Sequence, residues 1–144
     1  MPFDSYPHGG NRLLGRRSGA NCRHEYGLRL QRLTGQENCA YCGLRLVDSY
    51  EHWLMMSVDH VVPTRTGTVF MISTDWLEDY SNHVLCCSAC NGFGNRYTLM
   101  PDTRSPSSIE EFFSLRDRVF LERKTLILLA HEKERAFFEK KPWK

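Results

Sequence analysis

Apolar positions in the first part of the chain predict one short helix behind an irregular segment. Residues 1–20 are rich in Gly, Arg and Asn and show no periodicity, which is typical of a flexible basic arm. Tyr26, Leu30 and Leu33 then follow at helical spacing as far as Gly35, a residue type that commonly ends helices. We therefore predict a helix over about residues 24–34.

The middle of the chain carries two apolar stretches separated by turn residues. The run "HWLMMSVDHVV", bounded by Pro63, predicts a strand over about residues 53–61. The segment "DWLEDY" predicts a short helix, and "HVLCC" predicts a second strand. A further helix is expected to begin in "SACNGFGNRY", weakened by Gly92 and Gly94.

The C-terminal part of the chain predicts a long helix. After the linker "TRSPSS", Ser108 and Glu111 show the spacing of a capping box, and the apolar residues that follow recur on one helical face. The helix could run to about residue 140, which exceeds the usual length of about 8–20 residues. We therefore expect a break near Lys124–Thr125, giving one helix or two.

These elements predict a single α+β domain, since 144 residues suffice for one hydrophobic core. We divide it into a basic arm with a short helix at 1–35, a compact core at 36–104 and a helical extension at 105–144.

Composition favours a soluble protein, because 41% hydrophobic and 25% charged residues are ordinary values for that class. The opening "MPFDSYPHGGNRLLGRRS" lacks the apolar stretch of a secretory signal, and "TLILLA" is too short to cross a bilayer. We therefore expect a cytoplasmic protein with no membrane partner.

Charge is distributed unevenly about a net value of +2. The formal charge is +4 over residues 1–36, −5 over 37–103 and +3 over 104–144. Such a pattern fits a central cation site flanked by arms that bind a polyanion, but charge alone favours the alternative of ordinary solvated faces.

Two identical CxxC pairs indicate a metal site. Four thiolates are the number that a tetrahedral structural zinc ion needs, and the pairs supply them as Cys39, Cys42, Cys87 and Cys90. The alternatives are two unrelated pairs of buried thiols or a redox pair, and neither pair opens a helix after a parallel strand as a redox motif would. Cys86 is then expected to be a buried core thiol. Cys22, near His24, is expected to be a spare thiol, with membership of a metal site as the alternative.

Further polar residues lie around these cysteines in a distinctive order. "CAYCG" is followed by "VDHVVP", then by Asn82 five residues before Cys87, and by Asn91 directly after Cys90. Over roughly residues 36–97 this order resembles the HNH nucleases, the zinc-stapled branch of the ββα-metal (His-Me finger) nucleases. The resemblance implies a small ββα-metal core with a structural zinc site.

The resemblance also implies a role for four residues. Asp59 matches the metal-binding carboxylate and His60 the general base. Asn82 matches the residue that braces the loop and orients the histidine, and Asn91 matches the second protein ligand of a catalytic Mg²⁺ or Mn²⁺ ion. The alternative for Asn91 is a helix cap just after the cysteine pair.

Contacts to nucleic acid are less well indicated. Relatives often carry a Gly-Gly turn where this chain has "TRTGT" and a lysine where it has "GFGNR", so Arg96 is a candidate substitute for that charge and Asn95 a competing ligand. Arg12, Arg16 and Arg17 lie in the basic arm and are candidate phosphate contacts. For Arg116, Arg123 and Lys124 a solvated helix face is the expectation, and His83 receives no role.

The sequence therefore predicts a metal-dependent endonuclease acting on DNA. The alternative is a zinc-stabilised nucleic-acid-binding module without catalysis, which would not need Asp59, His60, Asn82 and Asn91 together. A homodimer would be one way to cut both strands. The target, the choice of DNA over RNA and the biological role are left open by the residues.

Overall fold

The computed structural model describes residues 1–7, 9–13, 15–17 and 19–144. The N-terminal part contains a 3-10 turn at Pro2–Ser5, α1 at Gly19–Asn21, a π-helical turn at Cys22–Tyr26 and α2 at Gly27–Thr34. The central part contains α3 (Tyr50–Leu54), β1 (Met56–His60), α4 (Thr64–Val69), α5 (Thr74–Leu77), a 3-10 turn (Tyr80–Asn82), β2 (His83–Cys87) and α6 (Ser88–Gly94). The helix α7 spans Ile109–Glu139.

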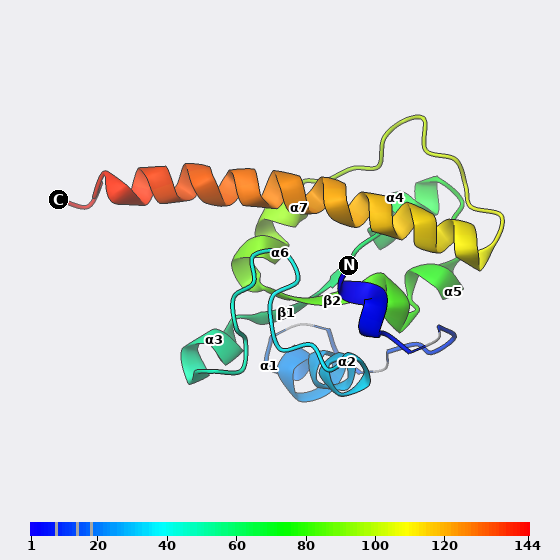
Figure 1. The fold of residues 1–144 in the computed structure, drawn as a ribbon, viewed down its shortest axis with the longest axis horizontal. Helices are drawn as coiled ribbons and strands as arrows, with labels where there is room; N and C mark the ends of the chain where they lie inside the picture. Colours follow the sequence, from blue (N-terminus) through cyan, green and yellow to red (C-terminus); the bar gives the residue numbers. More distant parts are fainter. Residues whose placement is uncertain (8, 14, 18) are drawn as a thin grey trace.

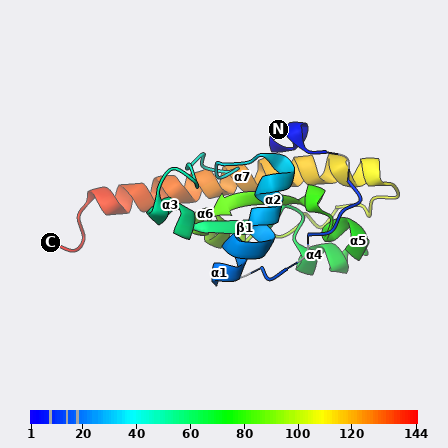
Figure 2. The same ribbon diagram turned by 90° about the horizontal axis from the view of Figure 1, so that it is seen from below.

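The two strands form an antiparallel sheet that lies between helices. β1 and β2 pair so that Met56 faces Cys87 and His60 faces His83. Figures 1 and 2 show α2 on one side of this sheet and α7 on the other, with α6 beside the sheet and below α7. The molecule is thus a mixed α+β fold, as the sequence predicted in outline.

The core gathers where these layers meet. Leu30 of α2, Val84 and Leu85 of β2, and Phe112 and Phe120 of α7 are all essentially inaccessible to water. Burial of such side chains stabilises the fold by about 1.5–3 kcal/mol each. The core therefore fixes β1, β2 and α6 relative to α7.

The predicted strand over residues 53–61 is wrong in its first part. Ser49 caps a helical turn by accepting a hydrogen bond from the backbone N–H of His52 at 3.1 Å, so residues 50–54 form α3. The strand begins only at Met56. A local capping interaction thus outweighs the apolar run that suggested extended backbone.

The described part of the predicted flexible arm is packed rather than free. Phe3 and Leu13 are buried, and the Tyr6 hydroxyl donates to the carbonyl of His83 at 2.7 Å. The backbone of residues 10–12 also contacts Asp79 and Tyr80, which follow α5. The segment therefore belongs to the body of the domain.

The helix near residue 24 begins earlier than predicted and ends as predicted. Helical backbone runs from Gly19 through a π-helical turn into α2, and it stops at Gly35. Gly35 adopts a left-handed φ of 70°, and its N–H donates to the backbone carbonyl of Gln31. Such a conformation is the usual reason for glycine at a helix end.

The helix α7 is continuous, so the predicted break near residues 124–125 is wrong. The 31 residues of α7 make a rod about 46 Å long. Ser108 caps it, because its hydroxyl oxygen accepts from the N–H of Glu111 at 3.2 Å. The Glu111 carboxylate in turn accepts from the backbone N–H and the hydroxyl of Ser107. No described helix is both long enough and apolar enough to span a membrane.

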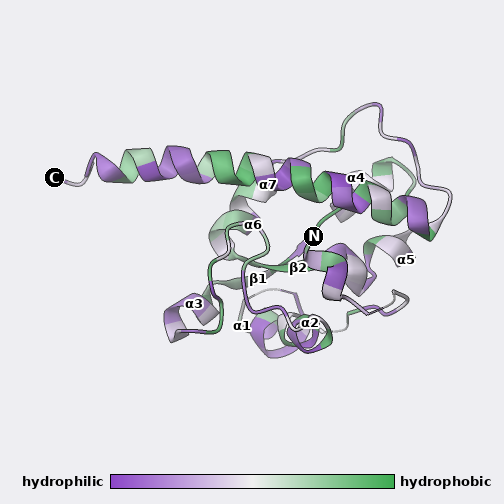
Figure 3. Ribbon diagram, in the orientation of Figure 1, coloured by the Kyte–Doolittle hydropathy of each residue, from purple (hydrophilic) through white to green (hydrophobic). Residues whose placement is uncertain are grey.

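The two ends of α7 differ in their surroundings. Its N-terminal part, as far as Ile127, packs on the body of the domain and buries five apolar side chains (Phe112, Leu115, Val119, Phe120 and Ile127). Its C-terminal end projects beyond the body and carries both polar and apolar residues (Figure 3), and residues 132–144 are exposed. The part of α7 before residue 132 is therefore the part that contacts the candidate sites.

Candidate functional site

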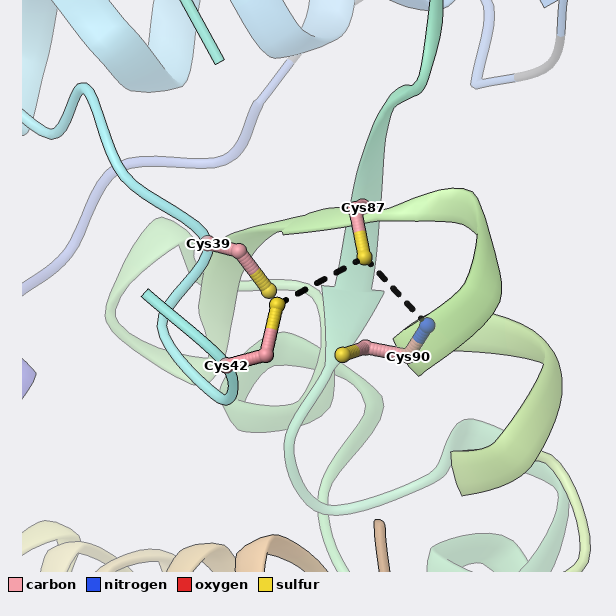
Figure 4. Close-up of side chains that lie close together, drawn as sticks. All are labelled: Cys39, Cys42, Cys87 and Cys90. Atoms are coloured by element: carbon pink, nitrogen blue, oxygen red, sulfur yellow. Dashed lines mark hydrogen bonds between the residues drawn. The ribbon is translucent and has the colours of Figure 1, made fainter. Parts of the chain in front are cut away.

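Four cysteines from two separate segments converge on one point. Figure 4 shows the side chains of Cys39 and Cys42 from one turn facing those of Cys87 and Cys90 from the end of β2 and the start of α6. Their sulfur atoms all lie within 4.8 Å of one another, and none forms a disulfide. The cluster could hold a metal ion such as zinc.

The local backbone explains why the sulfurs meet. The Cys39 N–H donates to the Leu44 carbonyl and the Gly43 N–H donates to the Cys39 carbonyl, and these bonds close the tight turn. Gly43 has a left-handed φ of 78°, which a side chain would strain. The turn is joined to β2 because the Ala40 N–H donates to the Leu85 carbonyl at 2.9 Å.

Spacing and electrostatics of the cluster suit a tetrahedral thiolate site. Cys42 Sγ and Cys87 Sγ are 3.8 Å apart, close to the separation of about 3.8 Å expected for two sulfurs bound to one zinc ion. Without an ion the thiols share hydrogen bonds, which lower the pKa of Cys39 and raise the pKa of Cys90. A bound divalent cation would favour all four thiolates at once.

A histidine of α7 touches this cluster. His131 Nε2 lies 3.0 Å from Cys90 Sγ, and its ring packs edge-on against Phe93 at 5.0 Å between centroids. An imidazole N–H directed at a ligand sulfur is the kind of outer contact that orients metal ligands. This contact was not predictable from sequence spacing, because His131 lies 41 residues from Cys90.

A second group of polar residues surrounds a cavity of about 440 Å³ beside the sheet. Asp59 and His60 at the end of β1 line it, as does Asn91 of α6. The structure therefore brings these three candidate residues to one cavity, whereas Asn82 is fully buried and is not among the residues that line it.

Asp59 is held in a buried network. Its carboxylate forms an ion pair with Arg123 of α7, with Arg123 Nη1 2.8 Å from Asp59 Oδ2 and Nη2 3.0 Å from Oδ1. The Tyr41 hydroxyl also donates to Asp59 Oδ2 at 2.5 Å. Burial and the Asp59 charge raise the pKa of Tyr41 well above its usual value, so the phenol stays a proton donor.

Arg123 and Arg116 contradict the expected solvated face of α7, since both side chains are buried. Arg123 also donates to the carbonyls of His60 and Val61 at 2.6 and 2.9 Å. Arg116 donates to the Ser81 carbonyl at 3.0 Å and lies over the rings of Phe3 and Phe113. The solvated face was expected because acidic residues lie near these arginines in the sequence. The contacts that bury them are to residues far away in the sequence and could not be inferred from that pattern.

His60 is mostly buried and faces several charged or titratable groups. Its Nε2 lies 3.5 Å from a Glu78 carboxylate oxygen and 3.4 Å from Arg17 Nη1. Burial lowers the pKa of His60, and the Glu78 carboxylate acts in the opposite direction. At neutral pH the imidazole is thus neutral and able to accept a proton.

His83 lies beneath His60, with the two rings 4.2 Å apart. Its Nδ1 is 2.6 Å from the Asp79 carbonyl and its Nε2 is 2.8 Å from the Tyr26 hydroxyl. A carbonyl only accepts, so Nδ1 carries the proton and Nε2 accepts from Tyr26. Burial lowers the pKa of His83 well below its usual value.

Asn82 fixes the chain just after His60. Its amide oxygen accepts from the Val62 N–H at 2.9 Å, and its amide nitrogen donates to the carbonyls of Val62 and Leu77 at 3.0 and 2.9 Å. Its own backbone carbonyl accepts from the Val61 N–H. The side chain therefore braces the segment that leaves β1.

Asn91 and Asn95 lie on the α6 side of the cavity. The Asn91 amide nitrogen donates to Ser57 Oγ at 3.1 Å, which leaves its oxygen as the atom that can bind a cation. Cys87, rather than Asn91, caps α6, because its sulfur accepts from the Cys90 N–H. Arg96 is exposed just beyond this helix.

The three candidate arginines of the N-terminal segment are distributed differently. Arg12 pairs with Asp75 away from the cavity, and Arg16 is exposed. Arg17 pairs with Glu78, is about half exposed and lines the cavity next to His60. Only Arg17 of these three therefore lies at the candidate site.

Comparison with protein-family models, with curated proteins and with solved structures finds no match for this chain.

Proposed function

We propose that this chain is an HNH-type endonuclease that hydrolyses phosphodiester bonds of DNA. The observation that carries the proposal is the meeting of Asp59, His60 and Asn91 around one cavity, although Asn91 is about 30 residues from the other two along the chain. The order β1–β2–α6 with a four-cysteine cluster at its junction supports a ββα-metal core. The Asn82 contacts support the bracing role that the resemblance implies.

The residues at the cavity fit a hard divalent cation. Asp59 would supply a carboxylate oxygen and Asn91 an amide oxygen, the ligand types that Mg²⁺ and Mn²⁺ prefer. Arg123 and Tyr41 use part of the acceptor capacity of Asp59, since a carboxylate has about four acceptor positions and three are engaged. Such an ion, when bound, supplies charge stabilisation to the phosphate and to the leaving oxygen.

The residues of the chain itself account for the proton transfer. His60 takes a proton from the attacking water, because its neutral imidazole lines the cavity. Asn82 holds the backbone beyond His60, and Glu78 lies against the ring and holds Arg17 nearby. In-line attack on the phosphorus would leave a 5′-phosphate and a 3′-hydroxyl, as the family resemblance implies.

Arginine side chains in and near the cavity support a polyanionic substrate. Arg17 and the exposed Arg65 both line the cavity, and Arg96 is exposed after α6. Lys and Arg side chains grip phosphates independently of base sequence. The zinc that the cysteine cluster would bind is structural in this proposal, because four thiolates fill a tetrahedral shell.

A second candidate is a zinc-stabilised nucleic-acid-binding module without catalysis. The buried ion pair of Asp59 with Arg123 favours it, since that carboxylate already has a structural use. Such a module would keep the cysteine cluster and the arginines and would need no second cation.

Melting of the zinc-loaded protein with and without Mg²⁺ separates the two candidates. Mg²⁺ selects oxygen ligands and so reports on Asp59 and Asn91 rather than on the histidines. The nuclease proposal expects a higher melting temperature with Mg²⁺, reduced or lost in Asp59→Asn and Asn91→Ala and retained in Asp102→Asn, a matched exposed control. Absence of any Mg²⁺ shift in the wild type would favour the binding module.

A further inference from the structure

A second cluster of side chains of metal-binding types lies beside the cavity, apart from the four cysteines. His60, Glu78 and His83 each place one ligand atom within 4.8 Å of the others. They come from β1, from the end of α5 and from β2, and the register of the sheet sets His60 opposite His83. Asp59 does not belong to this group.

The separations inside this cluster suit a borderline transition-metal ion. Ligands about 2.0–2.2 Å from a tetrahedral ion lie about 3.3–3.6 Å from one another. His60 Nε2 and Glu78 Oε2 are 3.5 Å apart, within that range. The His83 ligand atom lies within 4.8 Å of those of His60 and Glu78, so an ion would have to draw it closer by roughly 1 Å to reach this separation.

The electronic state of the donors also suits a metal. The His83 Nδ1–H donates to the Asp79 carbonyl, which leaves the Nε2 lone pair for an ion in place of its present donor, the Tyr26 hydroxyl. A backbone carbonyl that fixes the tautomer in this way commonly accompanies metal-binding histidines. Two imidazoles and one carboxylate are a ligand set that zinc accepts, with a fourth position for water.

We propose that His60, Glu78 and His83 form a binding site for Zn²⁺, separate from the cysteine cluster and from the Asp59–Asn91 pair. An ion bound there uses the lone pair of His60 Nε2, so His60 can no longer accept a proton. If the proposed nuclease function holds, Zn²⁺ at this site therefore inhibits cleavage by removing the base.

Arg17 is the group that opposes the ion. Its guanidinium pairs with Glu78 and lies 3.4 Å from His60 Nε2, and its side chain is about half exposed and able to turn outward. Removal of this cation in Arg17→Ala should tighten binding by up to about fivefold, the range expected for loss of one exposed ion pair. A gain of affinity from losing a surface arginine is specific to a cation site beside it.

Co²⁺ titration of protein loaded with one Zn²⁺ per chain, enough for the cysteine cluster alone, tests the site directly, since Co²⁺ takes the same ligands and absorbs visible light. We expect one Co²⁺ bound per chain beyond the cysteine cluster, with the weak visible bands of nitrogen and oxygen ligands. Glu78→Gln and His60→Gln should each weaken binding at least about tenfold, whereas Glu37→Gln, a matched exposed glutamate, should not. Asp59→Asn should also retain binding.

Two outcomes overturn the site, and neither depends on the buried His83. The first is no Co²⁺ bound beyond the cysteines. The second is binding that survives both Glu78→Gln and His60→Gln.

Cleavage assays test the inhibitory consequence separately. Micromolar Zn²⁺ should inhibit Mg²⁺-dependent plasmid cleavage in the wild type and inhibit it less in Glu78→Gln. Cleavage that is equally sensitive in both proteins would overturn the inhibition. Co²⁺ binding without any cleavage would contradict the proposed nuclease while supporting the site.

Discussion

At the scale of single residues, the environment of Asp59 is the least expected feature. Asp59 became a candidate ligand only through the resemblance of "VDHVVP" and its neighbouring motifs to the HNH nucleases. The sequence does not reveal Arg123, which lies 64 residues away and is among the most deeply buried side chains of the protein. The resemblance thus suggested the carboxylate, and only the packing of α7 on β1 reveals its partner.

The first prediction concerns this pair. Arg123→Met should lower the free energy of unfolding by about 3–5 kcal/mol, because it leaves a buried carboxylate without its counter-ion. Chemical denaturation measures the loss, with the exposed Arg135→Met as the matched control that should change little. An Arg123→Met variant as stable as the wild type would show that the buried pair has no role in folding.

The second prediction concerns the buried imidazole of His83. Burial lowers its pKa in the folded protein, whereas the unfolded chain binds a proton below about pH 6.5. The contribution of His83 to the free energy of unfolding is therefore fully present above that pH and is lost as pH falls. The loss is about 1.4 kcal/mol at pH 5.5 relative to pH 7.5.

Denaturation of the wild type and of His83→Gln at these two pH values isolates this contribution. The variant should lose less stability on acidification, whereas His24→Gln, at an exposed histidine, should behave like the wild type. Equal pH dependence in wild type and His83→Gln would contradict a neutral buried His83.

At the scale of elements, helices and strands with one strong local sequence pattern were predicted well. Those where two patterns compete were not. β2, the end of α2 at Gly35 and the start of α7 follow from strong local patterns. The extent of β1 was wrong because Ser49 caps α3 within the apolar run, and α7 continues because Ile127 reaches the core just beyond the expected break. The cysteine cluster was predictable, since its spacing is local within each pair.

The third prediction tests what the cysteine cluster does for these elements. We expect about one zinc ion per chain, and Cys39→Ser should unfold the protein at ambient temperature, because a structural zinc contributes about 10–16 kcal/mol of apparent binding free energy. Metal analysis and circular dichroism provide the measurement.

Cys86→Ala is the matched control, since Cys86 is buried next to the cluster but is not part of it. This variant should keep one zinc ion while losing some core packing. A Cys39→Ser protein that folds normally without zinc would contradict the structural role.

The fourth prediction assigns α7 a contact with that cluster. His131→Ala should weaken zinc binding by about 10–100-fold, the usual effect of losing an outer hydrogen bond to a ligand. Competition with a chelator measures the affinity. His52→Ala, at a histidine away from the cysteines that pairs with Asp48, should leave the affinity unchanged.

At the scale of the whole molecule, α7 connects the functional parts. Arg116, Arg123 and His131 recur at spacings close to two turns on the packed side of this helix. They reach the turn before β2, the end of β1 and the cysteine cluster, respectively. The single helix α7, which runs along one side of the molecule in Figure 1, therefore contacts both the end of β1 and the cysteine cluster.

The most direct test of the proposed nuclease is nicking of supercoiled plasmid by the zinc-loaded protein with Mg²⁺, Mn²⁺ or EDTA. The account predicts metal-dependent conversion to the nicked form, and at least about a hundredfold loss in His60→Ala, since general-base catalysis contributes about 10²–10⁴-fold. His24→Ala should cleave like the wild type. Nicking that persists in His60→Ala, or a folded wild type that never nicks with either metal, would contradict the proposal.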